Sequence, residues 1–463
     1  MTKRVNLQQL GVTGLERYGG YVNEEFLPEL RYPRAAKVYK EMADNDPVIG
    51  AMLFMSEMLI RAVDWRVEAA SDSAEDKEHA EFLESCMHDM SQSWASFINE
   101  VLSMFTYGFS FHEVVYKVRK GPHTNNPKYK SKYDDGRIGW RKISSRAQAT
   151  LLEWEFDEDG DVCAFIQLAP PKFDRVRIPM QKGLLFRTRV SKDNPEGKSL
   201  LRNAYRPWYF KKRIEEIESI GIERDLAGLP ILKAPEGVDL WDTSDPLMVQ
   251  QKAVAENIVT NVRNDATSGV LLPYGWEFEL ASTGGSRTFD TNAIITRWDF
   301  RIASTMLADI VLMGSEKAGS FALAELKGST FSDALEAQLQ NIADVINSHA
   351  VAQLFSLNGI WPKNGLPRIV PTHVKKPSIK EVALLLRTAN LDITEDLEFH
   401  NFVRDVCGLE HLSESEFKDL YERIEAKQAA QEQQNQPAYN TDDTIDNDFE
   451  QSDMAYDGGS YNG

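Results

Sequence analysis

Residues 199–230 read SLLRNAYRPWYFKKRIEEIESIGIERDLAGLP, and this stretch decides the fold that the chain is expected to adopt. Three isoleucines recur at helical spacing among lysines and glutamates: Ile214, Ile217 and Ile220. Apolar residues three positions apart lie on one face of an α-helix, so the pattern predicts a long helix over about 199–225. Pro207 is expected to kink the first third of this helix. Gly228 and Pro230 end it.

The chain then builds a small α/β module before it returns along a second helix. Residues 231–232 and 269–280 are typical of strands, whereas residues 245–263 have the apolar spacing of a helix. A second long helix is expected over 291–312. Two helices that bracket an insert of residues 226–288 are therefore the central architectural expectation.

The flanking sequence predicts a body of class α+β that is mostly helical. Residues 133–190 read as short antiparallel strands, with Asp135-Gly136 as one hairpin turn. Thr330 opens a long helix to about residue 357 with a sequence that resembles a capping box. Further helices are expected over 34–62, 73–90, 93–107, 378–390 and 394–407.

The chain is acidic, with 71 Asp and Glu residues against 52 Lys and Arg residues and a formal net charge of -19. A protein that binds phosphates over a broad surface carries the opposite balance, so tight nucleic-acid binding of that kind is not expected. No basic residue follows Lys427. The acidic, Asn- and Gln-rich residues 428–463 lack apolar periodicity and are expected to be disordered.

The cysteines and the apolar segments of the sequence indicate the cellular compartment in which the chain folds. Cys86, Cys163 and Cys407 lie far apart, which fits a reducing cytosol and neither a zinc site nor a disulfide framework. The N-terminus lacks the apolar region of a signal peptide, and the longest apolar stretch, 49–60, contains Ser56 and Glu57. No contact with a membrane is expected.

No motif for catalysis, metal or cofactor binding is expected, and the chain is not predicted to be an enzyme. The HExxH and GxSxG patterns are absent, and residues 314–320 lack the pattern of a phosphate-binding loop. His112 and Glu113 open a strand, where neighbouring side chains face opposite ways, so an ordinary surface pair is expected there. Adjacent carboxylates such as Asp134 and Asp135 fall in turns.

The charges and isoleucines of the 199–225 helix leave two questions open. Lys211, Lys212 and Arg213 could touch DNA phosphates, but they alternate with glutamates, which favours a solvated face or a contact between subunits. The isoleucine row suits either packing inside the chain or the heterologous interface that closes a ring. Packing inside the chain is the more common use of such a row.

Four short stretches resemble the portal proteins of tailed bacteriophages, particularly the Mu-like group. They are DWRVE at 64–68, FTYGFSFHEVVY at 105–116, AGLP at 227–230 and DIVLMG at 309–314. The resemblance spans about residues 45–410 and rests on the order and spacing of these stretches. The proline that the family usually carries near the end of the second long helix is absent here.

The resemblance implies the named regions of a portal subunit. Residues 1–30 would be an N-terminal arm, 31–198 a wing, 199–225 and 289–313 two stem helices, 226–288 a clip, 314–328 a tunnel loop, 329–427 a wing helix and crown, and 428–463 a disordered acidic tail. Lys317 and Lys327 would meet DNA from the tunnel loop. Four residues of the clip would dock partners: Trp241, Asp242, Tyr274 and Trp276.

The same resemblance implies partners and a location. The chain would form a dodecameric ring at one capsid vertex of the virion, after synthesis in the host cytoplasm. It would contact the major capsid protein and scaffold, the large subunit of the terminase motor and the head-tail connector. Double-stranded DNA would pass through the channel during packaging and ejection, and an acidic wall would let it slide.

Two other classes of protein remain as alternatives at this point. One is a different structural component of a phage particle, such as a connector or a minor capsid protein. The other is a divergent nucleic-acid enzyme. A ring with a central hole distinguishes a portal from the first class, and activity with a divalent metal would reveal the second.

Overall fold

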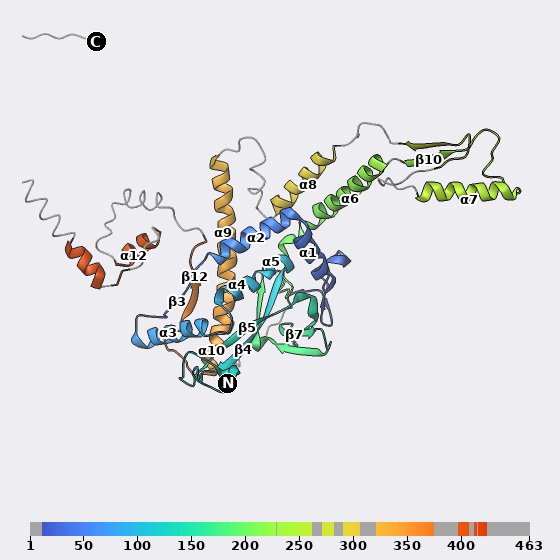
Figure 1. Cartoon of the computed structure of the whole chain (residues 1–463). Helices are drawn as coiled ribbons and strands as arrows, with labels where there is room; N and C mark the ends of the chain where they lie inside the picture. Colours follow the sequence, from blue (N-terminus) through green and yellow to red (C-terminus); the bar gives the residue numbers. More distant parts are fainter. Residues whose placement is uncertain are drawn as a thin grey trace, which may run out of the picture. The chain divides into compact units, whose positions relative to one another are not determined.

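A computed structural model describes residues 12–227, 229–261, 271–281, 290–305, 321–374, 397–406, 412–413 and 415–423. The chain divides into two compact units, Met1–Val374 and Lys375–Gly463. The first unit combines helices and antiparallel sheets, as the α+β expectation requires (Figure 1). In the second unit, α12 covers Leu397–Val406 and residues 415–423 are also helical. The helix expected over 378–390 and the acidic tail lie outside the described residues.

The first unit begins with a hairpin and two helices. The hairpin pairs β1 (Arg17–Tyr18) with β2 (Tyr21–Val22), and the helices are α1 (Arg34–Asn45) and α2 (Pro47–Arg61). The stretch 34–62 therefore contains two helices, because Asp46 accepts hydrogen bonds from the backbone N–H groups of Val48 and Ile49 and so caps the second one. Pro47 occupies the first position of α2, where its missing N–H costs no hydrogen bond.

Three further helices precede the sheets. They are α3 (Ala74–His88), α4 (Trp94–Val101) and α5 (Ser103–Tyr107). Ser73 and Ser93 cap the first two through their hydroxyl oxygens. Gly108 ends α5 with φ at 92°, a left-handed conformation that glycine adopts without strain.

Two three-stranded antiparallel sheets form the body with these helices. The first has the order β5-β4-β9, with β4 (Phe109–Val118) between β5 (Ile138–Arg146) and β9 (Gly183–Arg187). The second has the order β6-β7-β8, from Leu151–Phe156, Val162–Leu168 and Arg175–Pro179. A small core of Phe111, Trp154 and Phe165 is distinct from the main core, to which Trp140 and Phe186 of the first sheet belong.

One strand pair joins distant parts of the chain. β3 (Trp65–Glu68) pairs antiparallel with β12 (Arg368–Pro371). The segment between them contains α3, α4, α5, both three-stranded sheets and the long helices described next. Short 3-10 turns connect the other elements: Pro28–Leu30, Pro127–Tyr129, Gln148–Thr150, Met180–Lys182 and Leu200–Arg202.

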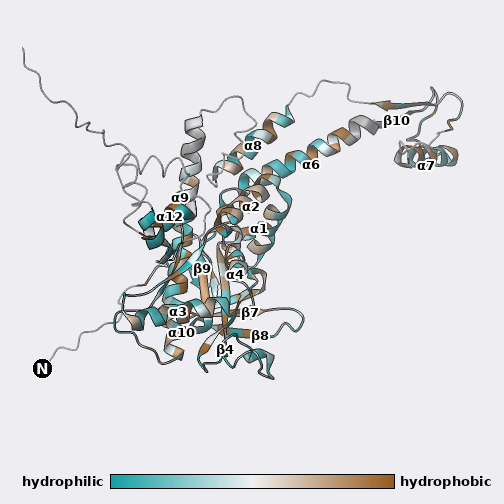
Figure 2. Cartoon of the chain, turned by 60° about the vertical axis from the view of Figure 1, so that its left-hand side comes forward, coloured by the Kyte–Doolittle hydropathy of each residue, from teal (hydrophilic) through white to brown (hydrophobic). Residues whose placement is uncertain are grey.

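The two expected long helices are present and pack against each other. They are α6 (Tyr205–Ala227) and α8 (Thr291–Thr305). Because α6 begins at Tyr205, Pro207 lies in its first turn, where no backbone hydrogen bond is lost, rather than in its interior. Figure 2 shows hydrophobic and hydrophilic residues alternating along both helices.

A small α/β module follows α6, as the sequence predicts. It contains β10 (Leu229–Lys233), α7 (Pro246–Asn261) and β11 (Glu277–Ala281), and β10 pairs antiparallel with β11 (Figure 1). Of its described residues only Ala255 is buried, and none belongs to either hydrophobic core. We call these three elements and their connections the tip module. It is therefore not part of the packed body.

The last long helix begins earlier than expected. α9 spans Phe321–Val345 and continues through a π-helical turn, Ile346–Val351, into α10 (Ala352–Leu357). Residues 321–328, which the expected tunnel loop includes, are thus helical, and the expected start at Thr330 is wrong. Residues 321–327 are Phe, Ala, Leu, Ala, Glu, Leu and Lys, which include several of the strongest helix formers.

Candidate functional site

The contact between α6 and α8 holds the tip module to the body. The rings of Phe210 on α6 and Trp298 on α8 stack with centroids 5.8 Å apart. Next to them, Lys211 Nζ lies 2.6 Å from Asp299 Oδ1 on α8 and 3.0 Å from Asp46 Oδ2 at the start of α2. One buried cation therefore ties both long helices to the helices of the body.

The charge on Lys211 is stable in this environment. Burial alone lowers the pKa of a lysine, but hydrogen bonds to Asp299 and Asp46 outweigh it and raise the pKa of Lys211 above its usual value. Lys212 pairs with Glu41, and Arg213 Nη1 lies 3.1 Å from Glu216 Oε2. The suggestion that these three cations touch DNA is therefore wrong for Lys211, which is enclosed within the subunit.

Two of the three isoleucines in the α6 row, Ile217 and Ile220, do not pack inside the subunit. Ile217 is 68% exposed and Ile220 is 50% exposed, whereas Ile214 is half-buried. Apolar side chains in a row on a helix surface are typical of an interface with another chain. Between the two uses that the sequence left open, the exposure favours contact between subunits.

The tip module encloses an apolar groove of about 260 Å³. α7 contributes Leu247, Val254 and Ile258, and Leu232 of β10 and Trp276 face them. This apolar surface, the pairing of β10 with β11 and the ion pair of Lys233 with Glu279 hold the small module together, because only Ala255 is buried among its described residues.

The four expected docking residues differ in their surroundings. Trp241 is 80% exposed, and Lys252 Nζ lies 4.0 Å from the centroid of its ring. Tyr274 is fully exposed. Asp242 accepts hydrogen bonds from the Ser244 hydroxyl and backbone, which lower the pKa of its carboxyl group. Trp276 instead lines the groove, so the structure groups it with the packing of the module rather than with the exposed three.

The two expected DNA contacts cannot be placed. Lys317 lies outside the described residues. Lys327 lies in the helical stretch at the start of α9, where only the backbone is described. Their contact with DNA stays a prediction.

The expected surface pair of His112 and Glu113 is wrong for the histidine. His112 is fully buried, its Nε2 lies 2.7 Å from Ser110 Oγ, and the rings of Phe97 and Phe186 meet it edge to face. Burial, together with the nearby Arg146 guanidinium, lowers the pKa of His112 to about 3. Glu113 forms an ion pair with Arg146. The histidine is therefore a neutral part of the main core.

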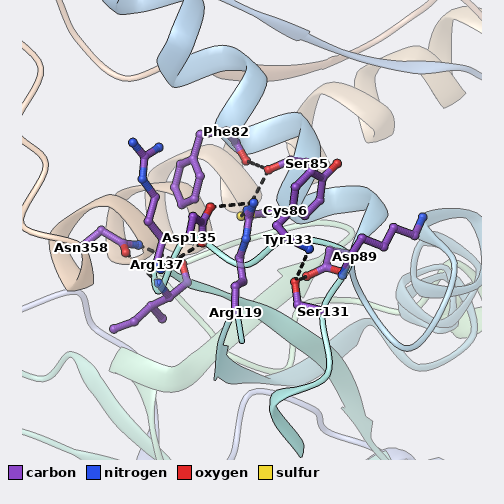
Figure 3. A network of polar contacts seen from close by, with 12 residues as sticks. Phe82, Ser85, Cys86, Asp89, Arg119, Ser131, Tyr133, Asp135, Arg137 and Asn358 are labelled. Atoms are coloured by element: carbon purple, nitrogen blue, oxygen red, sulfur yellow. Dashed lines mark hydrogen bonds and ion pairs between the residues drawn. The ribbon is translucent and has the colours of Figure 1, made fainter. Parts of the chain in front are cut away.

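Sequence reasoning also missed a buried polar network beside β4. Figure 3 shows Arg119 surrounded by Ser85, Asp135 and Tyr133. Its guanidinium donates to Ser85 Oγ at 2.8 Å, pairs with Asp135 Oδ2 at 2.8 Å and stacks 4.1 Å above the Tyr133 ring. Burial raises the pKa of the adjacent Cys86 thiol to about 11. The signal in the sequence is a pair of cations at the end of β4, Lys117 within the strand and Arg119 directly after it.

Within the described ranges, no group of three or more His, Cys, Asp and Glu side chains could hold a metal ion. None of the helices in the same ranges is long and apolar enough to cross a bilayer. The distinctive surfaces of the described chain are therefore the exposed row on α6 and the tip module.

The described part of the first unit is an α+β body that carries a peripheral module on two long helices. Comparison with family models matches residues 36–397 to the family described as "Portal protein of Mu bacteriophage". Because the match covers most of the chain, the chain belongs to this family and is a bacteriophage portal protein.

Solved structures provide further similarities of low sequence identity. A chain from the virion of a native gene transfer agent particle matches with a TM-score of 0.47 and 13% identity, over 82% of this chain and 95% of that chain. An HK97 family phage portal protein from Corynebacterium diphtheriae matches with a TM-score of 0.38 and 11% identity, over 73% of this chain and 93% of that chain.

Proposed function

We propose that this chain is one subunit of a dodecameric ring that occupies a single capsid vertex and forms the channel for double-stranded DNA. Membership of the portal family supports this function. The single observation that carries it is the exposed isoleucine row on a helix that also leads to an exposed module. A ring requires two different faces of each subunit to meet, and this row supplies apolar area for one of them.

The proposal assigns each region of the ring to elements of the chain. α6 and α8 would form the stem, the tip module the clip, and the body the wing. The chain would be made in the host cytoplasm and would join the virion by contact with the major capsid protein and scaffold. The connector, minor capsid and enzyme alternatives lose ground because the family is that of portal proteins.

The channel would carry DNA past an acidic wall with few cations. DNA has one negative charge per roughly 1.7 Å of axis, so a strongly basic wall would retain it at each step. Lys317 and Lys327 would make passing contacts with phosphates near the start of α9. Replacing both with Ala should reduce packaging or retention of DNA, and unchanged packaging would remove this role.

The clip would dock the large terminase subunit during packaging and the head-tail connector afterwards. Trp241 and Tyr274 present large exposed rings and Asp242 a charge, which suit a docking surface. Trp241→Ala should weaken binding to the terminase subunit. Trp361→Ala is a matched control because Trp361 is 77% exposed but lies in the body, and its replacement should leave this binding intact.

The decisive test of the ring is negative-stain electron microscopy of the purified protein. We expect closed rings with a central hole and a uniform subunit number. A protein that stays monomeric at every concentration would contradict the proposal. Nuclease activity that depends on a divalent metal would point to the enzyme alternative instead.

A further inference from the structure

One cavity in the body of this acidic chain is lined by cations. It has a volume of about 650 Å³ and lies beside β5 and the loop that joins β4 to β5. Six Lys and Arg residues are among those that line it: Lys117, Lys128, Lys130, Lys132, Arg141 and Lys142. A formal net charge of -19 for the chain makes such a local excess of positive charge unexpected.

A buried ion pair fixes the floor of this cavity. Lys117 Nζ lies 2.9 Å from Asp89 Oδ2 and donates to the Lys130 carbonyl oxygen at 2.9 Å. Asp89 also accepts from Ser131 Oγ at 2.6 Å and from the Lys132 backbone N–H at 2.8 Å (Figure 3). Burial by itself raises the pKa of Asp89, but these bonds outweigh it and lower the pKa. The carboxylate is therefore fully engaged in holding the loop.

The outer cations of the cavity have no carboxylate of their own. Among the ion pairs between described residues, none involves Lys128, Lys130, Lys132, Arg141 or Lys142. Some cations elsewhere are paired, as Lys212 is with Glu41 and Arg177 with Glu155, whereas Lys172, Lys182 and Lys363 stand apart from one another without an ion pair between described residues. Isolated surface lysines are usually just solvated. Five unpaired cations around one cavity, with its one carboxylate already used, instead fit an anionic ligand.

The geometry points to phosphate groups as this ligand, and we propose that the cavity binds the backbone of duplex DNA. Lysine ammonium groups are compact point charges that bind phosphate without a fixed orientation. Closely spaced phosphates can satisfy several of them at once. This contact lies apart in sequence from Lys317 and Lys327 and goes beyond the proposed channel.

An acidic peptide is the less suitable occupant. Peptides commonly bind by adding a strand to a free sheet edge. Here the outer edge of β5 is already used, since Ser91 N–H donates to the Arg141 carbonyl oxygen at 2.8 Å and Gln92 Nε2 donates to that of Ile143 at 2.8 Å. An acidic peptide could therefore bind this cavity only through its charge. Duplex DNA has a higher charge density than such a peptide.

The test measures binding of a labelled duplex to the purified full-length protein by fluorescence anisotropy at several salt concentrations. The variant carries Lys128→Ala, Lys130→Ala and Lys132→Ala. These side chains are exposed, and the bonds that fix the loop use only the backbone of residues 130 and 132, so the fold should persist. Removing three phosphate contacts should reduce the slope of log affinity against log salt by about 2 to 3.

A control variant makes the same change in charge elsewhere in the body. It carries Lys172→Ala, Lys182→Ala and Lys363→Ala, whose side chains are exposed and outside the cavity. We expect its salt slope and affinity to match those of the parent. Equal loss in both variants would mean general attraction to the surface and would overturn the proposal, as would an unchanged slope in the cavity variant.

Competitors separate the possible sources of negative charge. Inorganic phosphate should displace the duplex no better than chloride at equal ionic strength, and specific displacement by phosphate would make the free ion the occupant instead. If polyglutamate bound with the same salt slope as the duplex, the assignment of this cavity to DNA would be overturned. If both variants formed normal rings and bound DNA equally well, the DNA site in this cavity would be refuted. The proposed function would not be affected by that result.

Discussion

Lys211 shows how one residue connects three helices, and its replacement should be costly. Lys211→Met would leave Asp46 buried without its cation and would also remove the partner of Asp299. Removing one partner of a buried ion pair costs about 3 to 5 kcal/mol. The free energy of unfolding should therefore fall by about this amount. Lys212→Met is the control, because its pair with Glu41 is still reached by solvent and is worth at most about 1 kcal/mol. Chemical denaturation compares the two.

His112 should make the stability of the body depend on pH. Its pKa is about 3 in the folded chain against about 6.5 in the unfolded chain, so only the unfolded chain gains this proton between those values. The contribution is fully present above about pH 6.5 and is lost as the pH falls, by about 2 kcal/mol at pH 5.

The variant His112→Gln isolates this effect. Glutamine stays neutral and can still hydrogen-bond Ser110, so the variant should lose less stability than the parent between pH 7 and about pH 5. Melting temperatures at the two values provide the measurement. An equal decrease in both proteins would mean that other groups control the dependence on pH.

At the scale of elements, the tip module should be the least stable of the described parts of the first unit. Its packing depends on the groove beneath Trp276, while Tyr274 two residues earlier makes no such contribution. Trp276→Ala should therefore increase hydrogen exchange in β10 and β11, and Tyr274→Ala should leave exchange unchanged. Similar exchange in both variants would contradict this distinction.

The long helices and the insert between them could be predicted from the sequence because their signals are local. Helical spacing on α6, the breakers Gly228 and Pro230, and the alternation of element types in the insert need no tertiary information. The start of α9 was missed because Thr330 looks like a cap, whereas the preceding residues are themselves strong helix formers.

The buried polar residues could not be predicted, since their partners are distant in the sequence. Lys211 and Asp46 are separated by 165 positions, and no local pattern joins them. His112 was assigned to the surface on the assumption that one face of its strand is solvated. β4 lies between two strands and packs into both cores, so its side chains are buried on both faces.

For the whole molecule, the exposed row on α6 should control assembly. Ile217→Asp would place a charge where an apolar contact between subunits is proposed and should shift the protein from rings to monomers. Val176→Asp makes the same chemical change at another exposed apolar residue, on β8, and should leave rings intact. Mass photometry counts the species. Intact rings of the Ile217 variant would exclude this row from the interface.

The pairing of β3 with β12 sets when a newly made subunit becomes complete. Trp65 cannot meet Pro371 until the ribosome has synthesised almost all of the first unit, including the helix pair and the tip module. Contacts of such long sequence separation make folding slow, because a long loop must close before the contact forms. Nascent chains therefore keep an open β3 edge until late in translation, and only finished polypeptides can present a complete body to their neighbours.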